Sequence, residues 1–229
     1  MARELPIFPL PIVLFPGAPQ PLHIFEPRYR QLLADCLAGD HRFGITYVAP
    51  GGEEGAEALP APGDIRCVAV IRSTRQLGDG RADILTEGER RFVLLDWRPG
   101  ERMYRLARVE EFQDDPVEPG EARALAADVQ EGFRRLAGAL STLAGREFDE
   151  PLELPADAAA LSFRVAAALE LEPAAKQALL AGRSTTARLR QLAALLGPLA
   201  GEAERRASVR GRAKRNGRGG SHPQIERTT

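Results

Sequence analysis

The sequence predicts an α+β protein with a β-rich first half and a helical second half. Between residues 42 and 111 apolar and polar residues alternate with a period of two, which is typical of strands. Beyond residue 124 apolar residues recur every three or four positions, which is typical of amphipathic helices. Acids and prolines interrupt both patterns at residues 113–121, so we predict a β-rich domain over residues 1–115 and a helical domain over residues 116–207.

The chain begins with a proline-rich segment, LPIFPLPIVLFPGAPQPLHIFEPRYRQLL, at residues 5–33. Its seven prolines between Pro6 and Pro27 are incompatible with an ordinary helix or a central strand, because proline lacks an N–H donor. The segment therefore predicts short edge strands and extended pieces that wrap the sheet. Pro27 suits the first position of a helix, and the apolar residues after it have helical spacing up to a stop at Gly39.

The next elements are short strands joined by turns. Residues 43–47 and 65–75 alternate, and Asp79-Gly80 predicts the turn of a hairpin. Three further strands are predicted by the segments ADILTEG, RRFVLLDW and MYRLARVEEF. A tight turn that enters a strand is predicted at residues 88–92, with the sequence GERRF. Many short strands at this spacing are typical of an antiparallel barrel or a rolled sheet.

The second half predicts a helical bundle. One side of a long helix is marked by Leu125, Val129, Phe133, Leu136, Leu140 and Leu143. Shorter helices are predicted after the sequence LPAD, from Pro173 onward, and after Ser184, which suits an N-cap.

The composition is that of an ordinary soluble protein, with 44% hydrophobic and 28% charged residues. No apolar run reaches the roughly 20 residues that a membrane span needs, and the N-terminus lacks the features of a signal peptide. We therefore expect a cytoplasmic protein without a membrane partner. Cys36 and Cys67 are expected to be buried thiols, since a zinc site or a disulfide framework needs more cysteines.

Charge is unevenly distributed along the chain. The net charge is −1, but residues 202–229 hold eight Arg or Lys and three Glu, a surplus of five positive charges. Residues 208–229 contain many Gly and Arg and almost no apolar side chains, which predicts a disordered basic tail. The two lysines, Lys176 and Lys214, do not follow a glycine, so the sequence lacks the Gly-Lys pair of a P-loop ATPase.

The segment HIFEPRYR combines several ionisable side chains at the start of the first predicted helix. Glu26 and Arg30 are four positions apart with the acid first, so together with Pro27 they predict a structural clamp. In the alternative, His23 or Arg28 turns outward toward a ligand. Catalysis is not expected, because His23 has only Glu26 as a nearby orienting partner, and no metal or cofactor site is predicted.

Aromatic and basic residues also occur together near the end of the β-rich half. Arg90 and Arg91 are expected to point to solvent or to an acid, while Phe92 faces the core. Trp97 and Tyr104 flank a turn with the sequence RPGE. We expect Trp97 and Tyr104 to pack in the core. If they instead form an exposed apolar patch at this turn, that patch would indicate a partner site.

Together these segments resemble the substrate-binding N-terminal domain of Lon proteases, in its standalone bacterial form. The resemblance covers residues 5–200 and rests on PLPIVLFPG…PLHIFEPRYR, FGITYV, GDIRCVAVI, LGDGRADILTEGERRF and LPADAAALSFRVAAALELEPAAKQALL. It implies a PUA-like barrel with one helix, a following helical bundle, and recognition of unfolded or tagged protein segments. A protease or a chaperone is an implied partner.

In full Lon proteases this domain precedes an ATPase module and a Ser-Lys peptidase module. The Gly-Lys pair is absent here, and no oxyanion hole is predicted beside Ser162 and Lys176, so we expect a non-enzymatic module. Our first hypothesis is a protein- or peptide-binding module with an apolar groove rimmed by charge. The candidate peptide-binding residues are His23, Glu26, Arg28, Arg90, Trp97 and Tyr104. The alternative is an RNA-binding protein that uses the PUA-like barrel and the basic tail.

Overall fold

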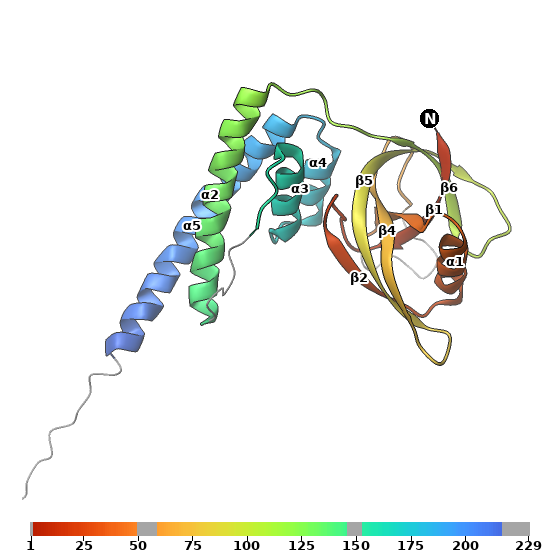
Figure 1. The fold of residues 1–229 in the computed structure, drawn as a ribbon, viewed down its shortest axis with the longest axis horizontal. Helices are drawn as coiled ribbons and strands as arrows, with labels where there is room; N and C mark the ends of the chain where they lie inside the picture. The colour runs from red at the N-terminus through yellow and green to blue at the C-terminus, as the bar shows by residue number, and fades with distance from the viewer. Residues whose placement is uncertain (1, 50–58, 146–152, 217–229) are drawn as a thin grey trace, which may run out of the picture.

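The computed structural model describes residues 2–49, 59–145 and 153–216 and confirms the α+β class. Figure 1 shows two regions side by side, a curved sheet with one helix and a group of further helices. The first region, here called the β-body, comprises β1 (Arg3–Leu10), β2 (Pro19–Ile24), α1 (Pro27–Ala38), β3 (Arg42–Tyr47), β4 (Ile65–Gln76), β5 (Ala82–Arg98) and β6 (Arg105–Glu111).

The strands of the β-body form one sheet in the order β2-β5-β4-β3-β1-β6, and β5 also pairs with β6. This additional pairing closes five strands into a ring and leaves β2 as an edge strand on β5. The prediction of an antiparallel sheet is wrong at one place, because β1 pairs with β3 in parallel, with Ile7 opposite Gly44. Helix α1 lies between these strands in the sequence and forms part of the crossover that parallel pairing requires. The PUA-like assignment stays a prediction.

A single long strand, β5, replaces two of the predicted short strands. The turn predicted at residues 88–92 is wrong, since Gly88 lies within β5 and pairs with Ala69 of β4. A Cβ added at Gly88 would lie 2.0 Å from the carbonyl oxygen of Phe15. The glycine therefore marks a close approach of two backbones. The hairpin turn at Asp79-Gly80 is confirmed, and Gly80 has a φ of 79°.

The helical region contains α2 (Pro119–Ala144), α3 (Ala158–Ala168), α4 (Pro173–Ala181) and α5 (Thr185–Asn216). Helices α2 and α5 run side by side in the same direction and project away from the β-body (Figure 1). Gly132 permits their close approach, because a Cβ at this position would lie 3.1 Å from Leu196. Helices α3 and α4 lie between this pair and the β-body (Figure 1).

Helix α5 extends into the predicted basic tail. Residue 208 was expected to begin that tail, but the helix continues to Asn216. One contact supports the extension, because Arg210 donates to the carbonyl of Leu143 at the end of α2. Residues 217–229 lie outside the described residues, and the RNA-binding alternative that depended on the tail stays a prediction.

The β-body and the helical region share a hydrophobic core. The boundary predicted near residue 115 falls in the segment between β6 and α2. Buried residues on both sides of it nevertheless belong to one cluster, and the ring centroids of Phe15 and Phe163 lie 6.3 Å apart. A smaller cluster of the β-body includes Leu5, Ile7, Phe92 and Leu94. This shared core holds the two regions close enough to form a surface between them.

Candidate functional site

The loop between β1 and β2 is fixed to the middle of β5. Gly17 donates to the carbonyl of Gly88 at 2.7 Å, and Gly88 donates to the carbonyl of Ala18 at 2.9 Å. Gly17 has a φ of 73°, a conformation that glycine adopts without strain. In this loop Leu14 and Phe15 are buried, while Ile12 and Val13 just before them are partly buried and pack against the core.

Ile12 and Val13 of this loop line a pocket of about 470 Å³ between the β-body and the helical region. Phe133 of α2 and Ala168 of α3 form part of its opposite wall. Ile12, Val13 and Phe133 are partly buried, and Ala168 is exposed. Arg164 and Lys176 also line it, so cations stand beside an apolar floor.

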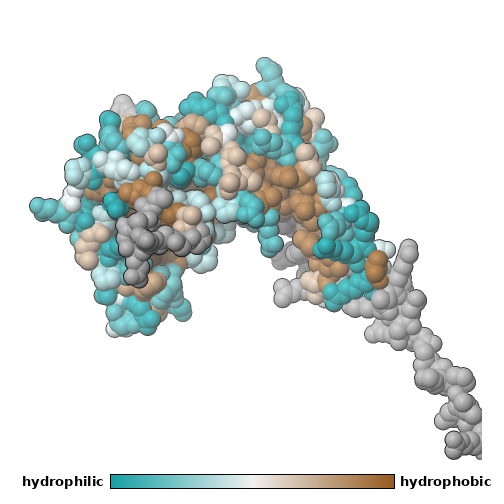
Figure 2. Space-filling model, turned by 180° about the vertical axis from the view of Figure 1, so that it is seen from behind, coloured by the Kyte–Doolittle hydropathy of each residue, from teal (hydrophilic) through white to brown (hydrophobic). Residues whose placement is uncertain are grey.

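A second pocket of about 540 Å³ continues from the first, because Phe133 and Ala168 line both. It follows α2 and α5 away from the β-body and contains Leu140 and Leu199, which are 51% and 38% exposed. Figure 2 shows hydrophobic surface gathered over this part of the molecule. We call the two pockets together the apolar groove.

The sequence contained a signal for this groove that the prediction missed. Leu140 was assigned to the same helical stripe as Val129, which is fully buried. Leu136 of the same stripe is buried, whereas Leu140 is half-exposed and lines the second pocket.

Three of the predicted site residues come together beside the groove. His23, Glu26 and Arg28 line a pocket of about 270 Å³ with Phe25, which is 57% exposed. His23 Nδ1 lies 2.7 Å from a carboxylate oxygen of Asp83, its partner across the β2–β5 pairing. The ring centroids of His23 and Phe25 are 5.9 Å apart and stacked.

The side chains of Glu26 and Arg30, which form the predicted clamp, contact other partners. Glu26 is the N-cap of α1 with extended backbone angles, and its backbone carbonyl, rather than its carboxylate, accepts from the Arg30 N–H at 2.9 Å. Its carboxylate accepts instead from Arg28 Nε at 2.9 Å. The Arg30 guanidinium lies against Gly80 of the β4–β5 turn. Pro27 is the first residue of α1, as predicted.

Tyr104 shares a further pocket, of about 350 Å³, with Arg28. The Tyr104 side chain is buried, and its hydroxyl donates to Asp35 at 2.7 Å and accepts from Arg102. Burial, together with the hydrogen bond to Asp35, raises the pKa of Tyr104 to about 12. The hydroxyl is therefore a neutral donor over the physiological pH range.

Arg90 and Trp97 lie away from the other predicted residues. Arg90 forms an ion pair with Glu89 and lines a separate small pocket. Trp97 packs against the smaller core cluster, and its indole N–H donates to the carbonyl of Pro60 at 3.1 Å. A role in peptide binding stays a prediction for all six residues.

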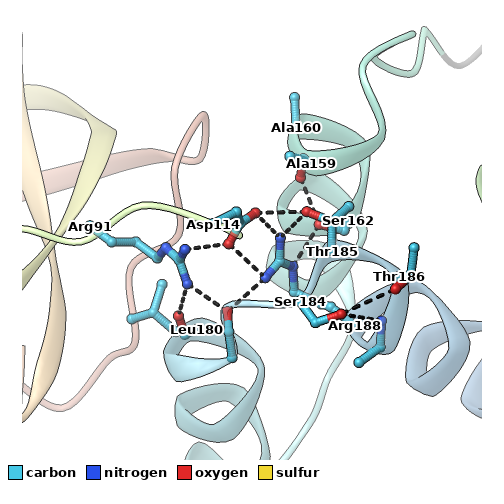
Figure 3. A network of polar contacts seen from close by, with 12 residues as sticks. Arg91, Asp114, Ala159, Ala160, Ser162, Leu180, Ser184, Thr185, Thr186 and Arg188 are labelled. Carbon is cyan, nitrogen blue, oxygen red and sulfur yellow. Dashed lines mark hydrogen bonds and ion pairs between the residues drawn. The ribbon is translucent and has the colours of Figure 1, made fainter. Parts of the chain in front are cut away.

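A buried polar network joins the β-body to the helical region (Figure 3). Arg91 of β5 donates to the carbonyls of Leu180 and Gly182 at 2.7 Å each and forms an ion pair with Asp114. Arg188 of α5 donates to Asp114 at 2.6 Å. Burial lowers the pKa of Arg91, and attraction to Asp114 opposes this shift.

We call Arg91, Asp114 and Arg188 the interdomain network. The side chain of Arg91 was expected to point to solvent or to an acid, and its ion pair with Asp114 confirms the second of these. Local patterns gave no signal for Arg188, because its partners Asp114 and Ser162 lie far away in the sequence. The Arg188 side chain also stacks over the Phe163 ring, with its guanidinium carbon 4.0 Å from the ring centroid.

The serine and lysine considered above as a peptidase pair have other partners. The Ser162 hydroxyl donates to the Ala159 carbonyl at 2.6 Å and accepts from Arg188 at 2.7 Å. Lys176 Nζ donates to the Ala167 carbonyl at 3.4 Å. Within the described ranges no group of three or more His, Cys, Asp or Glu could hold a metal ion, and none of the helices described is long and apolar enough to span a membrane.

Comparison with known proteins relates this fold to one family. A family model described as the ATP-dependent protease La (LON) substrate-binding domain matches residues 4–197. The chain is 27% identical to a Lon N-terminal domain protein from Xanthomonas campestris, with a TM-score of 0.58 over 84% of this chain and 98% of that one. The N-terminal domain of a Mycobacterium avium complex Lon protease has the same fold at 20% identity, with a TM-score of 0.59 over 85% of this chain and 98% of that one. This chain belongs to the LON substrate-binding domain family.

Proposed function

We propose that the protein is a non-enzymatic recognition module that binds unfolded or tagged polypeptide segments in the apolar groove. Membership of a substrate-binding family supports binding of protein. The observation that carries the proposal is the groove itself, because it leaves Leu140 and Leu199 half-exposed along a continuous surface. An exposed and continuous apolar surface of this kind is typical of a protein–protein interaction site.

The dimensions and chemistry of the groove favour an extended chain with apolar side chains. Its two pockets, of about 470 and 540 Å³, share Phe133 and Ala168, so one segment can occupy both. Folded proteins bury such side chains, whereas unfolded segments present them. Arg164 and Lys176 stand beside the groove and favour substrates that also carry acids.

No catalytic step is proposed for the groove. The Ser162 hydroxyl is held by Arg188 and is fully buried, so it has no access to a peptide. His23 contacts Asp83 on the exposed face of β2 and β5, and its ring has no nucleophile among its described contacts. A partner protease would supply hydrolysis.

The proposal is tested by replacing Leu140 with Lys and measuring binding of a fluorescent peptide that contains Leu and Phe. Because Leu140 is half-exposed, the protein tolerates the change, and the unfolding midpoint should stay within error. The dissociation constant should rise about tenfold, as expected when one apolar contact is replaced by a charge.

Val117→Lys is the matched control, since Val117 is 39% exposed and lies outside the groove. It should bind the peptide like the original protein. Ile12→Ala tests the opposite end of the groove and should also weaken binding. If Leu140→Lys and Ile12→Ala both remain folded and bind normally, the groove is not the binding site.

A further inference from the structure

Four arginines line the pocket of about 350 Å³ that also contains Tyr104, and its lining includes no acidic residue. Arg28 comes from the start of α1, Arg98 from the end of β5, Arg102 from the β5–β6 connection and Arg105 from the start of β6. Two segments of the β-body, the start of α1 and residues 98–105, thus bring guanidinium groups to one place. We call it the arginine pocket.

The guanidinium groups are only partly neutralised by neighbouring acids. Arg28 donates through Nε to Glu26 at 2.9 Å. Arg98 donates through Nε to Glu4, and Arg102 donates through Nη1 to Asp35, at 3.3 Å each. Arg98 Nη1 also lies 4.0 Å from Asp96. The side chains of Arg98 and Arg102 remain nearly half-exposed. Within the part of the chain that the structure describes, the side chain of Arg105 has no hydrogen-bond or ion-pair partner.

This arrangement is suited to a carboxylate. A guanidinium presents five N–H donors in a planar fork that matches two carboxylate oxygens, and each observed ion pair uses only part of that fork. Several like charges around one pocket repel one another, and an entering anion relieves this repulsion. The pocket is mainly polar, so an apolar side chain gains little there.

The arginine pocket lies on a path to the apolar groove. It shares Pro9, Arg28 and Tyr29 with the pocket of His23, and that pocket shares Pro11 with the groove. A polypeptide that occupies the groove can therefore continue along the end of β1 toward the arginines.

We propose that the arginine pocket binds Asp or Glu side chains of the polypeptide whose apolar residues occupy the groove. This inference rests on the proposed function and adds a preference: apolar segments flanked by acids bind more tightly than the same segments flanked by neutral residues. The acidic flank contacts Arg98 and Arg105, while the apolar part contacts residues such as Leu140.

The test uses the full chain and three labelled peptides. The first carries Leu and Phe with a Glu flank, the second has the same apolar residues with a Gln flank, and the third has the Glu flank without the apolar residues. Arg98→Gln/Arg105→Gln is the test variant, because both side chains are exposed. Arg123→Gln/Arg134→Gln is the control, since it removes the same charge from exposed positions on α2 outside the arginine pocket and the groove.

The original protein should bind the Glu-flanked peptide about tenfold more tightly than the Gln-flanked peptide, as expected for one or two charge-assisted contacts. The Arg98/Arg105 variant should lose this preference and bind the Gln-flanked peptide normally. The control should keep most of the preference, and added salt should reduce it.

The inference is overturned if the two apolar peptides bind equally, or if the Arg98/Arg105 variant keeps the preference of the original protein. In either case the proposed function survives, because the Gln-flanked peptide still binds. If only the peptides with a Glu flank bind and the Arg98/Arg105 variant abolishes that binding, the arginine pocket is supported while the apolar groove is rejected.

Discussion

The interdomain network lies where the β-body meets the helices, and the apolar groove begins there and continues along the helices, yet their chemistry is opposite. In the network, Arg91, Asp114 and Arg188 are buried or nearly so and satisfy one another through hydrogen bonds. In the groove, apolar side chains such as Leu140 remain exposed to water. The charged side chains of the network are buried and the apolar side chains of the groove are exposed, which is the reverse of the usual arrangement in a folded protein.

This difference assigns separate tasks to the two surfaces. Buried charges require specific geometry, because an unpaired buried charge is costly, so the network fixes the relative position of the two regions. Apolar contacts are not directional, so the binding that we propose for the groove would admit side chains of different shape. A recognition module for varied segments needs both properties, a rigid frame and a permissive surface.

The largest effect is expected when the network is broken. Asp114→Ala leaves Arg91 and Arg188 buried without their shared carboxylate, which should lower the free energy of unfolding by about 3–5 kcal/mol. Chemical denaturation of both proteins measures this loss. The same variant should bind the apolar peptide more weakly, because the two walls of the groove lose their fixed separation.

Asp115→Ala is the matched control. Asp115 is the next residue, is 59% exposed and lies 3.8 Å from Arg183, so its loss should have almost no effect on stability. An equal loss of stability in the two variants would mean that the network does not fix the regions.

A smaller effect is expected at the contact between β5 and the loop that lines the groove. Gly88→Ala places a Cβ against the carbonyl of Phe15, so the loop must move outward, at a cost of about 1–3 kcal/mol. Peptide binding should weaken because Ile12 and Val13 move with the loop. Gly78→Ala is the control, since nothing lies within 4 Å of a Cβ at that position. Normal peptide binding by a folded Gly88→Ala protein would contradict the role of this contact.

The smallest effect is expected at Tyr104, whose polar contacts lie within the β-body. Its pKa is about 12 in the folded protein and about 10 in an unfolded chain, so the folded state favours the neutral hydroxyl. The resulting stability is present below about pH 10 and is lost as the pH rises toward 12. Between these values the free energy of unfolding should fall more steeply for the original protein than for Tyr104→Phe. Parallel slopes would show that the hydroxyl does not contribute this pH dependence.

The order and type of most elements were predictable because they depend on local patterns. Pro27 at the start of α1 and the Asp79-Gly80 turn follow from backbone properties of single residues. The long stripe on α2 predicted its helix correctly. Such features need no knowledge of distant parts of the chain.

The errors have one physical cause, which is contact between distant segments. Gly88 resembled a turn residue, but it is required by the backbone at Phe15. Composition alone predicted a tail from residue 208, whereas Arg210 of α5 contacts the end of α2. Asp114 belonged to an acidic linker by sequence, and only the fold brings Arg91 and Arg188 to it.

The prolines of β2 also limit how a substrate can be held. β2 is an edge strand, and Pro19 and Pro21 remove two of its N–H donors. A polypeptide therefore gains no regular ladder of main-chain hydrogen bonds by adding to that edge, and neither does a second copy of the protein. The same prolines that shape the entry to the fold thus disfavour strand addition at this edge, and the binding that we propose depends on side-chain contacts.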